Sequence, residues 1–255
     1  MSRTIVITGA SSGIGRALAL HYAREGASLG LLGRNSVRLQ AVADECAALG
    51  ASVQTRALDV CDRAKMAQWL EEFDRSTPVD LVIANAGLMA GTPPGSEIEA
   101  AEAGYGAIET NVLGVLNTVQ PLLPPMVARG RGQVAIVSSL AAFVALPDSP
   151  SYCASKAAIL AYGRSLRALL APCGVGVSVI CPGYVATPMS LRETGHKPMT
   201  VSAARAVTII ASGLSRNKAV IAFPFLLAWG ARLHSVLPDW LQRRILPAFR
   251  FNVLD

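Results

Sequence analysis

The 255-residue chain is 52% hydrophobic and only 16% charged, a composition that supports a large buried core and argues against a disordered protein. Its formal net charge of +6 fits an anionic cofactor or an anionic membrane surface, but no basic cluster is interleaved with aromatic residues, so we expect no nucleic-acid site. A chain of this length corresponds to one large α/β domain or two small ones.

The five cysteines form no C-x-x-C pair and no metal-ligand spacing. Because an odd number of cysteines argues against a disulfide framework, we expect a reducing cytoplasmic environment and no metal site. The chain enters a strand-like run at once, at residues 3–8, with neither the charged nor the long apolar region of a signal peptide, so we expect no signal peptide.

Strand-like and helix-like segments alternate along the chain. The expected strands are residues 3–8, 28–32, 53–57, 80–84, 133–137, 176–180 and 220–222. The expected helices are residues 16–25, 37–49, 64–73, about 100–126, where Pro121, Pro124 and Pro125 limit the end, and a helix that opens at 151–156 and continues to 170. This alternation, without repeats or a linker, predicts a single α/β domain over residues 1–255, with a Rossmann-type doubly wound parallel sheet of about seven strands and helices on both faces.

A glycine-rich segment follows the first expected strand. Gly9, Gly13 and Gly15 form a G-x-x-x-G-x-G pattern between strand and helix, and Ser11 and Ser12 add hydroxyl donors. Glycines let the backbone turn sharply and let its N–H groups approach a pyrophosphate, which the positive end of the next helix also attracts. The pattern therefore predicts dinucleotide binding, and a tight turn that simply needs glycine is the alternative.

The end of the second expected strand predicts which dinucleotide binds. A carboxylate there would bind the ribose 2′-OH of NAD, but this chain has Gly33-Arg34-Asn35. Because the Arg34 guanidinium can pair with a 2′-phosphate, the sequence favours NADP over NAD. The alternative is a solvated loop arginine.

Tyr152 and Lys156 lie four residues apart at the start of an expected helix, so their side chains share one face. A lysine charge beside a phenol favours the phenolate, so we expect the pKa of Tyr152 to lie below its ordinary value of about 10. Tyr152 would then be a proton donor near neutral pH. A solvated surface pair is the alternative for these two residues taken alone.

Further short motifs occur in order along the chain: Leu58-Asp59-Val60, Asn85-Ala86-Gly87, Asn111-Val112-Leu113-Gly114, Ser139 thirteen residues before Tyr152, and Pro182-Gly183 followed by Thr187. With the glycine-rich loop at residues 8–15, they make the chain resemble the short-chain dehydrogenase/reductases from Thr4 to about Thr187. The cofactor-binding residues that this resemblance and the patterns above imply are Gly9, Ser11, Ser12, Gly13, Ile14, Gly15, Arg34, Asn35, Asp59, Val60, Asn85, Ala86, Gly87, Tyr152, Lys156, Pro182, Gly183, Val185 and Thr187.

The resemblance also implies four catalytic residues. Tyr152 would donate a proton to a carbonyl oxygen as hydride arrives from the nicotinamide, and Ser139 would hydrogen-bond the same oxygen. Lys156 would lower the Tyr152 pKa and hold the nicotinamide ribose, while Asn111 would fix a water that links Lys156 to solvent. Ser138 competes with Ser139 for its role, and a local backbone hydrogen bond is the alternative for Asn111.

Two segments carry the least information. Residues 188–205 correspond to the family's mobile substrate loop, and residues 223–255 form an apolar C-terminal extension that mixes tryptophans and arginines. The extension is either an interfacial amphipathic segment or a helix pair over the substrate cleft or at a subunit interface. We expect it to fold beside the substrate loop and shield the cleft, because Trp229 and Trp240 are costly to leave in water, and we expect an apolar substrate.

The leading functional prediction is an NADP(H)-dependent oxidoreductase acting on a ketone or secondary alcohol. Alternatives are a membrane-associated reductase of a long-chain keto-lipid or glycan precursor, with peripheral membrane contact through the extension, and a non-catalytic NADP sensor. The resemblance further implies a homo-oligomer, with a dimer preferred over a tetramer. Its contact would use the helices that carry Asn111 and Tyr152, where the small residues Ala157, Ala158, Ala161 and Ala168 allow close approach.

Overall fold

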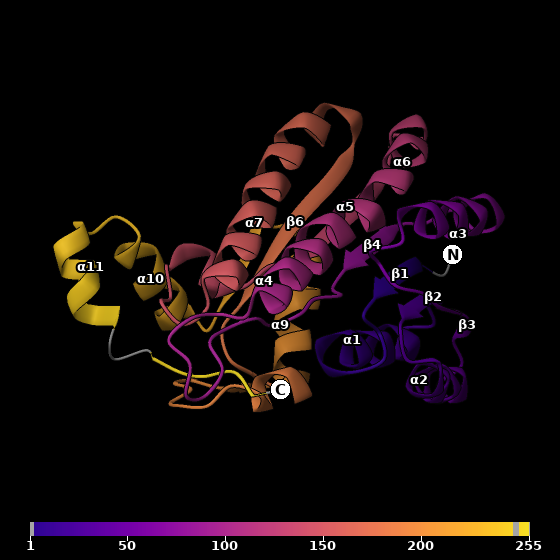
Figure 1. Cartoon of the computed structure of the whole chain (residues 1–255). Helices are drawn as coiled ribbons and strands as arrows, with labels where there is room; N and C mark the ends of the chain where they lie inside the picture. The colour runs from indigo at the N-terminus through magenta and orange to yellow at the C-terminus, as the bar shows by residue number, and fades with distance from the viewer. Residues whose placement is uncertain (1–2, 247–249, 255) are drawn as a thin grey trace.

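The structure is a computed structural model that describes residues 3–246 and 250–254. Seven parallel strands form one sheet in the order β3-β2-β1-β4-β5-β6-β9 (Figure 1). Their bounds are β1 Thr4–Thr8, β2 Ser28–Gly33, β3 Ser52–Ala57, β4 Leu81–Ala84, β5 Gly132–Val137, β6 Val175–Pro182 and β9 Val220–Phe223. The strand order reverses between β1 and β4, and in such sheets ligands bind outside the carboxyl ends of the strands at that point.

The central strands are apolar because helices cover the sheet on both faces. Every residue of β1 and β4 is buried, and the edge strand β3 is the one that carries exposed polar side chains. In the register of the sheet, Ile5 of β1 lies between Leu29 of β2 and Leu81 of β4. The expected doubly wound α/β fold is confirmed, and each expected strand agrees with the observed one to within two residues at either end.

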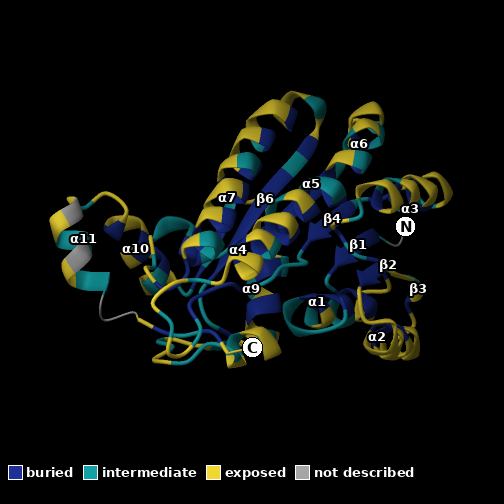
Figure 2. Ribbon diagram, viewed as in Figure 1, coloured by how far each residue is buried: buried dark blue, intermediate teal, exposed yellow. Residues whose placement is uncertain are grey.

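One face of the sheet is covered by α1 (Gly13–Arg24), α2 (Ser36–Ala48) and α9 (Ala203–Ser215), which contribute Leu18, Leu39 and Ile210 to one hydrophobic core. The opposite face is covered by α3 (Arg63–Ser76), α5 (Gly114–Val119) and α7 (Pro150–Leu170), with Leu70 and Ile159 in a second core. Figure 2 shows the buried side of these helices turned to the sheet and the exposed side turned outward.

The long helix expected over residues 100–126 is instead a series of segments. They are α4 (Ala101–Ile108), a π-helical turn at Glu109–Leu113, α5, a 3₁₀ turn at Gln120–Leu122, and α6 (Leu123–Arg129). The expectation that prolines stop the helix near residue 126 was wrong. Pro121 and Pro124 lie in the first turns of the 3₁₀ turn and of α6, where a missing N–H removes no helical hydrogen bond.

Residues 188–205 are more regular than expected. They contain α8 (Pro188–Leu191), and β8 (Val201–Ser202) pairs in parallel with β7 (Val185–Ala186). Helix α9, which the sequence reading missed, begins inside this range at Ala203. The Ser202 hydroxyl caps it by accepting a hydrogen bond from the Arg205 N–H at 3.2 Å, a standard start signal for a helix.

The C-terminal extension forms α10 (Phe225–His234) and α11 (Asp239–Ile245), and residues 250–254 then lie against the substrate loop. The Thr194 N–H donates to the Asn252 carbonyl at 2.8 Å, and the Leu254 N–H donates to the Arg192 carbonyl at 2.7 Å. Of the helices that the structure describes, none combines the length and hydropathy needed to cross a bilayer.

Candidate active site

A cavity of about 630 Å³ lies at the carboxyl ends of the strands. Three groups of residues line it: the glycine-rich loop with the end of β2, the segments that carry Ser139 and Tyr152, and an apolar wall from the C-terminal extension. The expected cofactor residues all line this cavity except Gly15, and of the expected catalytic residues Ser139, Tyr152 and Lys156 line it while Asn111 does not. A single cavity therefore brings together motifs that are far apart in the sequence.

The glycine-rich loop is tied to the end of β4. The Asn85 side-chain amide donates to the carbonyls of Thr8 at 3.0 Å and Gly9 at 3.3 Å. Gly9 has φ +65°, and a Cβ there would lie 2.8 Å from the Cα of Ala86. Gly15 is buried beneath the loop, where a Cβ would lie 2.6 Å from the Asn85 Nδ2. Gly15 therefore permits close packing of the loop against Asn85, and it does not line the cavity itself.

The N-terminus of α1 opens onto this cavity. Ser12 is the N-cap residue but its hydroxyl makes no capping hydrogen bond, and Ser11, Gly13 and Ile14 line the cavity beside it. The first N–H groups of a helix have no intrahelical partner and carry partial positive charge. The loop thus offers free donors and glycine-lined space to an anionic group, so its residues fit the diphosphate of a dinucleotide.

Arg34 lies at the edge of the cavity, mostly exposed, with its Nη1 3.7 Å from the Asp59 Oδ2. Asn35 caps α2 by accepting from the Arg38 N–H at 2.8 Å, and the Arg38 side chain also lines the cavity. The sequence reading missed Arg38, although its place one turn after Arg34 was a usable signal. Two guanidinium groups and one carboxylate thus surround this end of the cavity.

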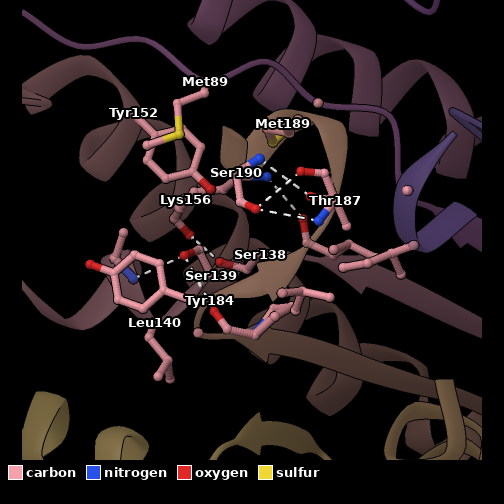
Figure 3. A pocket seen from close by; sticks show the side chains of 18 of the residues that line it. Met89, Ser138, Ser139, Leu140, Tyr152, Lys156, Tyr184, Thr187, Met189 and Ser190 are labelled. Atoms are coloured by element: carbon pink, nitrogen blue, oxygen red, sulfur yellow. Dashed lines mark hydrogen bonds between the residues drawn. The ribbon is translucent and has the colours of Figure 1, made fainter. Parts of the chain in front are cut away.

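Figure 3 shows the side chains of Ser139, Tyr152 and Lys156 grouped together on one wall of the cavity. The Lys156 Nζ donates to the Val137 carbonyl at 3.1 Å and lies 5.6 Å from the centroid of the Tyr152 ring. The Ser138 hydroxyl is occupied, because it donates to the backbone carbonyl of Lys156 at 2.8 Å. Ser139 accepts from the Ala141 N–H and remains the serine beside Tyr152.

The pKa of Tyr152 differs from the sequence expectation. Burial raises the pKa of Tyr152 above its ordinary value, the neighbouring Ser139 hydroxyl partly opposes that rise, and the Glu193 carboxylate adds to it. Burial also lowers the pKa of Lys156 to about 8. The expected lowering of the Tyr152 pKa by Lys156 is therefore not found, because desolvation dominates and the Nζ lies over the ring.

Asn111 lies fully buried in the π-helical turn between α4 and α5. Its Oδ1 accepts from the Leu88 N–H at 2.8 Å, and its Nδ2 donates to the Leu88 carbonyl and to the Ser155 hydroxyl, both at 2.9 Å. These partners are distant in sequence, so the alternative of a local backbone hydrogen bond does not describe this residue. Asn111 joins the segment after β4 to α7, and π-helical turns occur frequently at functional sites.

The segment after β6 approaches the glycine-rich loop from the opposite side. The Gly183 N–H donates to the Phe223 carbonyl at 2.7 Å, and a Cβ on Gly13 would lie 3.5 Å from the Thr187 side chain. Thr187 caps α8 through a reciprocal pair of hydrogen bonds with Ser190. Pro182 and Val185 also line the cavity. These contacts hold residues 182–187 across the opening from α1.

The sequence reading did not identify individual residues of the extension as cavity residues. These are Leu226, Leu227, Gly230, Ala231, Leu233, His234, Leu237, Ile245, Leu246 and Phe251, and Glu193 of the substrate loop lines the cavity as well. Trp229 and Trp240 are 59% and 64% exposed, so the extension lines the cavity without burying these tryptophans, which were the reason given for expecting it to shield the cleft. Leu227 and Ala231 lie four residues apart, and this helical spacing of apolar residues was the sequence signal available for this wall.

Within the described part of the chain, no group of three or more His, Cys, Asp or Glu side chains is placed to hold a metal ion. The polar side chains that line the cavity include the hydroxyl, phenol, ammonium, guanidinium and carboxylate groups described above.

Comparison with known proteins agrees with this site. Residues 3–197 match the family model described as short chain dehydrogenase. The chain is 38% identical over 238 residues to an uncharacterized oxidoreductase of Myxococcus xanthus, with 93% of each chain covered. It is 35% identical over 191 residues to oxidoreductase UcpA of Escherichia coli, which covers 74% of this chain and 71% of that protein.

Solved structures show the same fold. A short-chain dehydrogenase from Sphingobium yanoikuyae in complex with NADPH superposes with a TM-score of 0.79 at 27% identity, covering 93% of this chain and 97% of the other. A short-chain dehydrogenase/reductase from Burkholderia phymatum in complex with NAD gives 0.82 at 25% identity, covering 91% and 92%. The chain therefore belongs to the short-chain dehydrogenase/reductase family, whose members are oxidoreductases that interconvert C=O and CH–OH groups with a nicotinamide cofactor.

Proposed function

We propose that this protein is an NADP(H)-dependent oxidoreductase that interconverts a ketone and a secondary alcohol. The observation that carries the proposal is the grouping of Ser139, Tyr152 and Lys156 on one wall of the cavity that the glycine-rich loop also lines. When bound, the nicotinamide cofactor supplies or accepts the hydride. A sensor would have no need of a proton donor beside its cofactor, so the grouping supports an enzyme.

Tyr152 is the proposed proton donor to the carbonyl oxygen. Because burial raises its pKa, the phenol holds its proton at neutral pH, as a general acid must. The Ser139 hydroxyl, which lies beside the phenol, would hydrogen-bond the same oxygen and orient it. Lys156, whose pKa is about 8, carries much of its charge near neutral pH and stabilises the phenolate that remains after the proton leaves.

Lys156 and Asn111 form the proposed route for replacing that proton. A Cβ on Gly87 would lie 3.1 Å from the Asn111 Oδ1 and 3.4 Å from the Lys156 Nζ, so both groups border the small space that Gly87 leaves. A water held there would join the ammonium to solvent. Lys156 would also bind the nicotinamide ribose hydroxyls, as proposed from the family resemblance.

The proposed preference for NADP rests on Arg34, with Arg38 as a second cation beside the same end of the cavity. A guanidinium can pair with both oxygens of a 2′-phosphate, which NAD lacks. Asp59 opposes this preference because its carboxylate already lies near Arg34. The remaining cofactor residues would contact the diphosphate, adenine and nicotinamide from the positions described above.

A panel of aliphatic, cyclic and aromatic ketones and secondary alcohols, followed by NADPH absorbance, tests the proposed function. Apolar ketones should be reduced, because the extension lines the cavity with leucines. If NADPH binds and no carbonyl or alcohol of the panel reacts, the proposed reaction is wrong.

A further inference from the structure

Glu193 is a half-buried residue that lines the cavity and has no hydrogen-bond partner for its carboxylate among the described residues. Lys197 acts on this carboxylate only as a nearby charge. Both carboxylate oxygens remain open to the cavity, since neither is among the described polar atoms that the fold encloses without a partner. A carboxylate in this state is free to accept a hydrogen bond from a group that enters the cavity.

The backbone pairing of Glu193 determines where its side chain points. Glu193 and Val253 form an antiparallel bridge, which lies between two backbone hydrogen bonds that join residues 192–194 to residues 252–254. In an antiparallel pair of this kind, the two opposite residues place their side chains close together on the same face. The side chains of Glu193 and Val253 therefore share one face.

This shared face belongs to the wall of the cavity that holds Tyr152. Val253 packs with Met89 and Phe251, and Tyr152 is partly buried against the same cluster. Met89, Tyr152 and Phe251 all line the cavity, as Glu193 does. The fold of the final segment thus brings an unpaired carboxylate to the same wall as the proposed proton donor.

The charge of Glu193 acts on two phenols of the cavity. The carboxylate raises the pKa of Tyr152 and the pKa of Tyr184, because a negative charge nearby disfavours the phenolate. Figure 3 shows Tyr152 and Tyr184 among the side chains around Ser139. Since such an effect weakens with distance, it agrees with a carboxylate close to the place where Tyr152 and Ser139 would meet the carbonyl.

We propose that Glu193 is a specificity-determining residue whose carboxylate accepts a hydrogen bond from a hydroxyl group close to the reacting carbonyl of the substrate. This inference rests on the proposed function, since it describes a second contact with the same substrate. A hydroxyl suits the site better than an ammonium group, because Lys197 already supplies positive charge near the carboxylate and Lys156 lines the same cavity. The leucines of the extension would hold an aliphatic chain, so the substrate class is aliphatic hydroxy ketones.

The inference is tested with two matched pairs of ketones, 1-hydroxyoctan-2-one with 1-methoxyoctan-2-one and 4-hydroxyoctan-2-one with 4-methoxyoctan-2-one. The two members of a pair carry an oxygen on the same carbon, but only the hydroxy ketone can donate a hydrogen bond. The assays are run at about pH 8, where the Glu193 carboxyl, with its pKa of about 7, is mostly charged. In at least one pair the wild type should show a kcat/KM about tenfold higher for the hydroxy ketone, as expected of one hydrogen bond to a charged group.

Variants of Glu193 separate binding from a structural role. Glu193→Leu should bring the kcat/KM ratio of that pair close to one, and Glu193→Gln, which keeps an oxygen acceptor without the charge, should retain part of it. A loss of folded protein lowers both values of a pair equally and leaves the ratio unchanged. Glu97→Leu, which replaces an exposed acid that does not line the cavity, is the control and should keep the wild-type ratio. Wild-type ratios near one in both pairs, or a ratio that Glu193→Leu leaves unchanged, would overturn the inference.

Direct binding of the same ketones, measured by isothermal titration calorimetry with the oxidised cofactor present so that no ketone is reduced, separates this inference from the proposed function. Discrimination by the wild type that Glu193→Leu removes, without turnover of any ketone when NADPH is supplied, would support the Glu193 contact and overturn the proposed reaction. Turnover of both members of each pair with equal kcat/KM would support the reaction and overturn the inference. Binding of none of the ketones would also overturn the inference.

Discussion

Arg34 is the residue that most directly determines cofactor choice in the proposed function. The wild type should bind NADPH more tightly than NADH, and Arg34→Ala should reduce NADPH affinity by about tenfold or more while changing NADH affinity little, because only NADPH presents a 2′-phosphate. Fluorescence titration with both cofactors measures this. Arg16→Ala, which breaks an exposed ion pair with Glu45 on α1 and α2, is a matched control. Equal wild-type affinities for the two cofactors would refute the assignment.

Glu193 should make the free energy of unfolding depend on pH. Burial raises its pKa from 4.5 to about 7, and Lys197 partly opposes the rise. Between these two values the unfolded chain releases a proton that the folded protein keeps, so this group makes the free energy of unfolding fall as pH rises from 4.5 to about 7.

Glu193→Gln should therefore remove that fall. Its melting temperature should match the wild type below pH 4.5 and exceed it above pH 7. Thermal melts across this range measure the difference, and parallel curves for the two proteins would show that Glu193 is not buried as described. The controls are melts of Glu97→Gln, an exposed acid on another loop.

Among the elements, the final segment at residues 250–254 joins three loops around the cavity. Asp148 is buried, pairs with Arg250 at 3.0 Å, and accepts from the Phe251 N–H at 3.1 Å, while the Val253 N–H donates to the Thr92 carbonyl. Phe251 and Val253 then pack with Met89. The segment thereby fixes the side of the cavity that holds Tyr152.

Asp148→Ala should lower the free energy of unfolding by about 1–3 kcal/mol, because it leaves the buried Phe251 N–H unpaired. It should also raise the KM for a ketone substrate several-fold while leaving NADPH affinity unchanged, since the contacts described for residues 250–254 are with Asp148, Thr92 and Met89 and not with the glycine-rich loop. Chemical denaturation and steady-state kinetics test the two effects, with Glu97→Ala as the control. Unchanged stability would mean that the segment does not hold the loops.

The elements also show what sequence patterns can and cannot predict. Continuous apolar runs such as Thr4–Thr8 predict buried parallel strands because covered sheets require them. Pro121 and Pro124 led to a wrong expectation for the end of the helix near residue 126, because proline stops a helix only when it lies beyond the first turn. At the site, the glycine-rich loop was predictable from its local geometry. The pKa of Tyr152 and the unpaired state of Glu193 were not, since both depend on burial by distant segments.

In the whole molecule, α4 and α7 pack side by side, and Figure 2 shows exposed residues along their outer side. Ala157, Ala158, Ala161 and Ala168 of α7 are exposed there, as are Tyr105 and Leu169. We propose a dimer through this surface. Ala161→Arg should convert it to a monomer by light scattering, and Ala47→Arg on the exposed side of α2 should not. A monomeric wild type would contradict the proposal.

The proposed reaction depends most on Tyr152 as the proton donor, and one variant tests this role directly. Tyr152→Phe removes the phenolic hydroxyl and keeps the ring that packs with Met89 and Phe251. With a ketone that the wild type reduces, the variant should lose at least about 100-fold in kcat, the usual contribution of a general acid, and retain its affinity for NADPH. Turnover at the wild-type rate by Tyr152→Phe would show that Tyr152 is not the proton donor.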